Sequence, residues 1–295
     1  MQNLAFANIT VEKNSIPLFK DKGVDISVLR LDKIHPIISG NKWFKLRFYL
    51  EEAKQLQKKT IVTFGGAYSN HIVATAAAGK MNALKSIGII CGEEASNLSP
   101  TLLQAKEQGM DLIFISRKEY KEKKIPEELQ SNEYYFINEG GYGKKGAEGA
   151  ANILDHCEKR NLTHYCCAVG TGTTMAGLIK ASLPGQTVIG ISVMKNNFEL
   201  DENVKSLLNG ENNFRIIHDY HFGGYAKYTL ELIGFMNEFY RQTTVPSDFV
   251  YTGKLFYAVN HLVQNNFFPP ESKLLIIHSG GLQGNASLSK GTLIF

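Results

Sequence analysis

The segment GNKWFKL places a lysine, Lys42, in an apolar and aromatic setting directly after the IISG run, which we expect to be extended. A lysine that is desolvated, or that lies near another cation such as Lys45, has a lowered pKa. Its neutral amine can act as a nucleophile toward an aldehyde or as a base. Taken singly, a lysine at the start of a helix is more often a solvated surface group, so this interpretation needs support from elsewhere in the sequence.

A second segment, AVGTGTTMAGL at 168–178, has two glycines and three threonines between an apolar run and a helix-compatible run. Glycines let the backbone approach an anion, threonine hydroxyls donate hydrogen bonds, and the following helix contributes its positive end. The segment matches neither the P-loop nor GxGxxG, which argues against nucleotide hydrolysis and dinucleotide binding. By itself it is equally compatible with a glycine turn that binds nothing. The phosphate-binding interpretation uses Gly170, Thr171, Gly172, Thr173 and Thr174.

Both segments lie in a chain that alternates strand-like and helix-like runs. The short apolar runs are typical of buried parallel strands, and they occupy 61–66, 86–92, 111–116, 163–170, 187–193 and 273–281. Helix-like runs lie between them, including 70–83, 147–160 and 176–183. This pattern predicts an α/β fold with open, twisted parallel sheets. In such sheets ligands bind beyond the carboxyl ends of the strands, where GGAYSN, GTGTT and HSGG lie.

Length and composition fit a two-lobed globular protein. The chain has 295 residues, of which 43% are hydrophobic and 20% charged, and it has no apolar run long enough to span a bilayer. Its first residues lack the features of a secretion signal, so we expect a cytoplasmic protein without membrane contact. The net charge of +4 is scattered along the chain, which argues against a nucleic-acid partner.

The cysteines and histidines give no sign of a metal site. No two cysteines form a CxxC pair with metal-ligand spacing, and the histidines form no HExxH or comparable pair. We therefore expect no metal, and we expect reduced core cysteines at Cys91, Cys157, Cys166 and Cys167.

GNKWFKL, TFGGAYSNHIVATAAAG and AVGTGTTMAGL, in this order, resemble the motif set of the 1-aminocyclopropane-1-carboxylate (ACC) deaminase and D-cysteine desulfhydrase family. Further matches are DFVYTGKLFYAV, LLIIHSGGLQG and a weaker FGGYAK, so the resemblance covers nearly the whole chain. The family is pyridoxal-phosphate dependent and has the tryptophan-synthase-β type of fold (fold type II), with the cofactor between two lobes. This implies a larger cofactor-binding domain at 1–45 and 151–295 and a smaller inserted α/β domain at 46–150.

The resemblance also implies roles for single residues. Lys42 corresponds to the lysine that forms a Schiff base with the cofactor and acts as the catalytic base, supported by Asn41. Ser69 and Asn70 correspond to the pair that binds the substrate carboxylate and the cofactor's 3'-hydroxyl. The loop at 170–174 corresponds to the phosphate site.

Three aromatic positions complete the implied substrate site. Tyr251 and Tyr225 match two tyrosines that face the substrate in the family. His71 stands where family members often have glutamine. Two interpretations of it stay open: the ring binds the substrate carboxylate, or it packs under the loop with its hydrogen bonds satisfied.

The partner of the pyridine nitrogen indicates the reaction type. A carboxylate partner keeps the ring a strong electron sink, whereas a hydroxyl makes it a weaker one. Thr252 stands where ACC deaminases of the family typically carry glutamate, and Ser279 where members usually have threonine, so both candidates are hydroxyls. Opening a cyclopropane ring needs strong electron withdrawal, whereas expelling a thiolate needs less. We therefore predict D-cysteine desulfhydrase-like elimination to pyruvate and ammonia, with ACC deamination as the alternative.

A hypothesis from another class is a non-catalytic protein that keeps the phosphate loop for a different phosphorylated ligand. Lys42 discriminates between the two, because a binding protein has no need of a lysine in the GNK context. For the enzyme, the resemblance implies a small amino-acid substrate and a homodimer.

Overall fold

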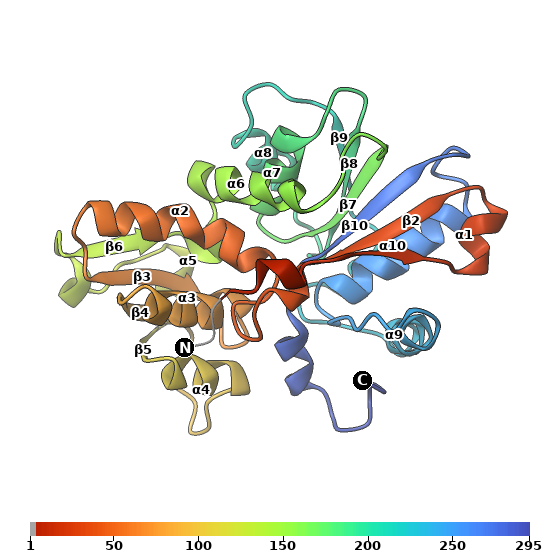
Figure 1. Cartoon of the computed structure of the whole chain (residues 1–295). Coiled ribbons are helices and arrows are strands. Elements are labelled where there is room, and N and C mark those ends of the chain that lie inside the picture. The colour runs from red at the N-terminus through yellow and green to blue at the C-terminus, as the bar shows by residue number, and fades with distance from the viewer. Residues whose placement is uncertain (1–3) are drawn as a thin grey trace.

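The predicted alternation of strands and helices is present in the computed structural model, which describes residues 4–295 (Figure 1). The strands are β1 (Val11–Asn14), β2 (Asp25–Arg30), β3 (Thr60–Gly65), β4 (Lys85–Cys91), β5 (Met110–Ile115), β6 (Tyr134–Ile137), β7 (His164–Val169), β8 (Thr187–Ser192), β9 (Phe214–Ile217) and β10 (Lys273–His278). The α-helices are α1 (Pro17–Asp21), α2 (Asn41–Gln55), α3 (Asn70–Met81), α4 (Pro100–Glu107), α5 (Arg117–Lys121), α6 (Lys144–Ala151), α7 (Thr173–Ala181), α8 (Leu200–Lys205), α9 (Leu230–Thr243) and α10 (Thr252–Gln264).

All six predicted strands are confirmed, as β3, β4, β5, β7, β8 and β10, whereas β1, β2, β6 and β9 were not predicted. Three of the missed strands, β1, β6 and β9, have four residues each and are mostly exposed or half-buried, and in β2 the polar residue Ser27 interrupts the apolar run. The helix predicted at 147–160 is wrong in its second half, because α6 ends at Ala151 and a 3-10 helix follows over Asn152–His156. The IISG run is not a strand either, since it bends before α2 begins.

The strands form two sheets. The larger has the order β1-β2-β10-β7-β8-β9 and is parallel except for β1, which pairs antiparallel with β2. The smaller has the order β5-β4-β3-β6 and is parallel throughout. This architecture confirms the predicted fold class. The predicted domain boundaries at 45/46 and 150/151 both fall inside helices, α2 and α6, and the strands of the smaller sheet lie between residues 60 and 137.

Both faces of the larger sheet are covered by helices, α6 and α7 on one side and α9 and α10 on the other (Figure 1). Because side chains of a strand alternate between faces, Cys166 packs with the α10 side and Cys167 with the α6 and α7 side. Both are fully buried free thiols, while Cys91 and Cys157 are partly exposed, so the expectation that all four cysteines are core residues is wrong for these two. Burial on both faces explains why the central strands read as continuous apolar runs.

Helix α2 connects the two sheets. Its first turn lies beside the end of β10, because the Asn41 backbone N–H donates to the Ser279 carbonyl oxygen over 3.2 Å. Its later residues, among them Leu46 and Leu50, pack with α3 and the smaller sheet. The residues that begin α2 therefore stand between the two lobes. No helix within residues 4–295 is long and apolar enough to cross a membrane.

Candidate cofactor and substrate site

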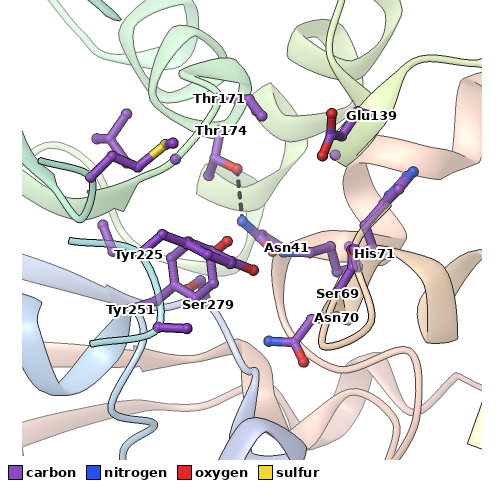
Figure 2. Close-up of a pocket in the computed structure, with 18 of the residues that line it drawn as sticks. Asn41, Ser69, Asn70, His71, Glu139, Thr171, Thr174, Tyr225, Tyr251 and Ser279 are labelled. Carbon is purple, nitrogen blue, oxygen red and sulfur yellow. Dashed lines mark hydrogen bonds between the residues drawn. The ribbon is translucent and has the colours of Figure 1, made fainter. Parts of the chain in front are cut away.

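A cavity of about 520 Å³ collects the polar strand ends of both sheets (Figure 2). Its lining comes from the residues that follow β3, β4, β6, β7, β8 and β10, together with the first turn of α2. This is the location that the rule for open α/β sheets predicts, because the carboxyl ends of parallel strands and the N-termini of the helices that follow them share one edge.

Lys42 lies in the first turn of α2 and lines this cavity. The turn needs Gly40, whose φ is 68° and where an added Cβ would stand 1.8 Å from the Ser279 carbonyl oxygen. The Lys42 ammonium donates to Asn41 Oδ1 over 2.8 Å and lies 5.7 Å from the centroid of the Tyr251 ring. Burial lowers the pKa of Lys42 to about 8, and the charge of Asp248 opposes this shift. A neutral amine is thus accessible near physiological pH, as a nucleophile or a base requires.

The glycine-threonine loop connects β7 to α7. Gly172 has φ 87°, and an added Cβ there would stand 2.7 Å from Val204 Cγ2, so the turn requires glycine. Thr174 Oγ1 accepts a hydrogen bond of 2.8 Å from Asn41 Nδ2, which ties this loop to the Lys42 turn. Thr173 is fully buried and does not line the cavity, in contrast to the expectation that it faces the ligand. The loop residues that do line it are Gly170, Thr171, Gly172 and Thr174.

Lys45 is a second lysine of the cavity, which the sequence presented only as a neighbouring cation. Its Nζ is 3.5 Å from Thr171 Oγ1, and the residue is 5% exposed. Burial, and then the charge of Lys42, place the pKa of Lys45 well below its usual value. The signal was in the sequence, because residues three apart on a helix share one face.

The donors on this side of the cavity fit a phosphorylated cofactor. The half-buried Lys42 and the buried Lys45 form no ion pair with any carboxylate in the described part of the chain. They stand beside the glycine-threonine loop, at the N-terminus of α7. Buried cationic groups are stable when an anion is supplied, and backbone N–H groups at a helix N-terminus favour phosphate. Pyridoxal phosphate meets both needs, with an aldehyde for Lys42 and a phosphate for the loop.

The opposite side of the cavity is the β3–α3 junction. Ser69 is the N-cap of α3, but its hydroxyl makes no capping bond to the helix. Asn70 Oδ1 and His71 Nδ1 are buried and have no hydrogen-bond partner. All three residues line the cavity, and Figure 2 shows them grouped on one side of it. Buried polar groups are rarely left unpaired, so this junction is built to receive a polar group of a ligand.

The hydrogen bonds of His71 define its tautomer. The Thr63 hydroxyl donates to the Ile137 carbonyl oxygen over 2.8 Å, and the same hydroxyl oxygen lies 2.8 Å from His71 Nε2. Because the hydroxyl has one proton, Nε2 carries the proton of this contact and Nδ1 is left as an acceptor. Burial, and then the charges of Lys45 and Lys42, keep the pKa of His71 well below its usual value. The ring is therefore satisfied on one nitrogen and open on the other, which combines the two interpretations drawn from the sequence.

Tyr225 and Tyr251 both line the cavity, as their motif context predicted. Their rings meet edge to face with centroids 6.0 Å apart and an interplanar angle of 72°. Burial raises the pKa of both phenols, that of Tyr251 well above its usual value. Both hydroxyls are therefore proton donors throughout the physiological range.

The two candidate hydroxyls for the pyridine nitrogen are separated by the fold. Ser279 follows β10 and lines the cavity. Thr252 is fully buried in the first turn of α10 and does not line it. Its hydroxyl donates to Asp248 Oδ1 over 2.7 Å and accepts from the Asp248 backbone N–H over 2.8 Å. The assignment of Thr252 to the cofactor is therefore not supported, because this hydroxyl is already used to hold a buried carboxylate.

A carboxylate that no sequence motif indicated, Glu139, enters the cavity from the chain after β6. The Tyr120 hydroxyl donates to Glu139 Oε1 over 2.6 Å, and Lys123 forms an ion pair with the other oxygen. Tyr120 also lines the cavity. In sequence these residues are unremarkable surface types; the pairing of β6 with β3 brings Glu139 to the site, and α5 brings Tyr120.

Comparisons with known proteins agree with this geometry. A family model described as pyridoxal-phosphate dependent enzyme matches residues 14–280. The chain is 31% identical to a putative 1-aminocyclopropane-1-carboxylate deaminase of Thermotoga maritima, over 89% of this chain and 90% of the relative. It is 29% identical to the mitochondrial bifunctional D-cysteine desulfhydrase/1-aminocyclopropane-1-carboxylate deaminase of Arabidopsis thaliana, over 89% of this chain and 73% of the relative.

A solved structure described as an ACC deaminase homologue superimposes on this chain with a TM-score of 0.83 at 26% identity. The superposition covers 94% of this chain and 90% of the other. The two-lobed architecture is therefore shared over nearly the whole chain.

Proposed function

Because the chain belongs to the pyridoxal-phosphate dependent enzymes, in the group of ACC deaminases and D-cysteine desulfhydrases, we propose that it eliminates the β-substituent of a small amino acid. D-cysteine is the substrate we favour. D-cysteine and water then give pyruvate, ammonia and hydrogen sulfide. Family membership sets aside the hypothesis of a non-catalytic phosphate-binding protein.

The observation that carries this proposal is the hydroxyl of Ser279 at the end of β10. Within residues 4–295, the carboxylate that lines the cavity is Glu139, and it enters from the smaller lobe, across the cavity from Ser279 in Figure 2. Asp248 is fully buried, and the backbone N–H groups of 250–252 donate to its carboxylate. A hydroxyl partner supports elimination of a good leaving group such as a thiolate better than the opening of a cyclopropane ring.

The residues that would hold the cofactor are those of the Lys42 side of the cavity. Thr171, Thr174, Lys45 and the N-terminus of α7 would hold the phosphate, with Lys42 as the covalent anchor. When bound, pyridoxal phosphate withdraws electrons from the α-carbon of the substrate and so makes its proton acidic.

Side chains of this protein carry out the remaining steps, which are substrate binding, removal of the α-proton and proton donation to the leaving group. The N-terminus of α3, with the free hydroxyl of Ser69, is suited to bind the substrate carboxylate. Lys42, with a pKa of about 8, is suited to accept the α-proton near physiological pH. Tyr225 and Tyr251 stay protonated and can donate a proton to the departing β-group. These roles together need no further catalytic group.

ACC deamination is the second candidate, and the names of the relatives favour it. Glu139 also lines the cavity, so a carboxylate is available to that reaction on the smaller-lobe side. A substrate panel separates the candidates, because pyruvate is a product of the elimination whereas deamination of ACC gives a four-carbon keto acid.

The test is a comparison of wild type with Lys42→Ala and with Lys145→Ala as a surface control. We expect wild type and the control to show a visible absorption band with pyridoxal phosphate that changes on adding D-cysteine, and to release pyruvate and sulfide. Lys42→Ala is expected to lose the band and to lower turnover by about 10³-fold or more, because it removes both the anchor and the base. A band without pyruvate from any β-substituted D- or L-amino acid would refute the elimination.

A further inference from the structure

A third buried lysine, Lys254, lies behind the cavity wall and has no role in the reaction described above. It is fully buried near the start of α10. Its ammonium donates to three backbone carbonyl oxygens, those of His221 over 2.8 Å, Gly224 over 2.7 Å and Val193 over 3.5 Å. An ammonium has three protons, so all of its donors are used.

This arrangement is unusual for a buried charge. In the described part of the chain, Lys254 forms no ion pair, so neutral carbonyl groups alone hold it in place. Burial lowers the pKa of Lys254 to about 8, and the charge of Asp248 opposes this shift. Burying an ammonium among neutral groups costs more free energy than burying an apolar side chain of the same size. A stability role alone would be served better by methionine or leucine.

The three carbonyls belong to two segments that carry cavity residues. Val193 directly precedes Met194, and Gly224 directly precedes Tyr225 and Ala226. Met194, Tyr225 and Ala226 all line the cavity. Lys254 thus connects both segments to the start of α10, next to Tyr251.

The segment at 222–226 cannot hold its shape by local preference. Phe222 and Ala226 have φ values of 49° and 53°, and Gly223 and Gly224 have 92° and 116°. Left-handed conformations are unfavourable for phenylalanine and alanine by about 1 kcal/mol each or more. The segment has no helix or strand to support it, so it depends on outside contacts such as the Lys254 bonds.

We propose that Lys254 is a positioning residue, which acts through the carbonyls of 221–224 to place Tyr225 against Tyr251 and so beside Lys42. The structure shows each contact of this series. Lys254 holds the segment, the Tyr225 ring meets the edge of Tyr251, and the Lys42 ammonium lies 5.7 Å from the centre of the Tyr251 ring. The part of the proposal that concerns turnover rests on the proposed function, and the part that concerns the segment does not.

The kinetic test is a double-mutant cycle of Lys254→Met and Tyr225→Ala, with Lys180→Met on α7 as the matched control. We expect Lys254→Met to lower kcat by about tenfold or more at nearly unchanged cofactor affinity, because a small misplacement of a reacting group is costly. In the Tyr225→Ala background the same change should lower kcat less than about threefold, since its target is gone. Multiplicative effects would overturn the proposal, as would a Lys254→Met protein with wild-type kcat.

Hydrogen exchange of the cofactor-loaded protein tests the segment without any substrate. Amides of 218–229 should exchange at least about tenfold faster in Lys254→Met than in Lys180→Met, while those of α3, which contains neither substitution, stay unchanged. Should Lys254→Met fail to fold, Lys254→Gln, which keeps two donors, replaces it, with an intermediate increase expected. Unchanged exchange in the variant overturns the proposal. Faster exchange in a protein that releases no pyruvate would uphold it while refuting the proposed elimination.

Discussion

The β3–α3 and β7–α7 junctions face each other across one cavity and have the same design, a parallel strand, a turn and a helix N-terminus. They differ in whether their polar groups are satisfied. At β7–α7, Thr174 is bonded to Asn41, and Thr171 lies within reach of Lys45 and Thr173. At β3–α3, Asn70 Oδ1 and His71 Nδ1 have no partner.

The β7–α7 junction is therefore the preorganised one. Bonds within the protein fix the β7–α7 turn before any ligand arrives, as a cofactor that stays bound requires. The β3–α3 junction leaves acceptors and a free Ser69 hydroxyl that an exchanging ligand can satisfy in each cycle. Changes at the first junction should therefore affect the cofactor, and changes at the second the substrate.

Gly172→Ala should give the largest effect, a loss of cofactor affinity of roughly 100-fold, because the added Cβ meets Val204 and distorts the turn. The matched control is Gly185→Ala, which has nearly the same φ, 86° against 87°, but open space around the added Cβ. Both variants should lose about 1 kcal/mol of stability from the left-handed conformation. Titration of the apoprotein with pyridoxal phosphate measures the affinity, and equal affinities for the two variants would contradict the preorganised turn.

Ser69→Ala should raise KM roughly 10- to 30-fold, because a hydrogen bond to a carboxylate contributes about 1.5–2 kcal/mol. Cofactor affinity should change less than about threefold if the two junctions are separate in function. Ser131→Ala is the control, since the exposed Ser131 hydroxyl accepts a bond from the Glu133 backbone N–H and does not line the cavity. Steady-state kinetics with D-cysteine and cofactor titration decide this, and a shift in the cofactor titration alone would reverse the assignment of the junctions.

His71→Gln tests the smallest difference between the two junctions. The β3–α3 junction contains an imidazole, a group that can take up a proton near neutral pH, whereas the hydroxyls of β7–α7 cannot. The unfolded chain protonates this imidazole below about pH 6.5, whereas the buried ring stays neutral, so wild-type stability falls as pH falls. Between pH 7.5 and 5.5 this single group should cost the wild type about 1.4 kcal/mol that the glutamine variant does not lose. Urea unfolding of the apoprotein at the two pH values measures it, with His218→Gln as an exposed control. If wild type and His71→Gln lost the same free energy of unfolding between the two pH values, the ring would have to be protonated in the folded protein.

The sequence predicted strands with continuous apolar runs well and strands with interrupted or half-exposed runs poorly. Val62, Cys166 and Ile276 lie in strands that are buried on both faces, so their apolar runs are continuous and easy to recognise. β9 and β6 have partly exposed residues, and a short, half-exposed strand leaves little pattern in a sequence. The end of α6 was also poorly predicted. Helix-compatible residues continue past Ala151, but in the fold the segment after Ala151 is a 3-10 helix.

The motifs placed most candidate residues at the cavity, and the exceptions have a common cause. Lys42, Ser69 and Tyr251 stand in motifs that resemble those of the family, and this resemblance, not local pattern alone, predicted their place at the cavity. Thr252 was misplaced because its side-chain direction depends on Asp248, four residues earlier, and on the packing of α10. The homodimer and the D-cysteine substrate stay predictions.

By itself the sequence determined the chain of strands and helices, the glycines that make the turns possible, and the lysine and hydroxyl side chains that give the site its chemistry. These depend on residue type and on neighbours within a few positions. Tertiary structure alone decided that Lys45, on the same helix face as Lys42, meets Thr171, that Glu139 enters from the other lobe, and that Lys254 holds the Tyr225 segment. The Lys45–Thr171 and Lys254–Gly224 contacts join residues 126 and 30 positions apart, and such contacts arise from packing, which a linear pattern does not contain.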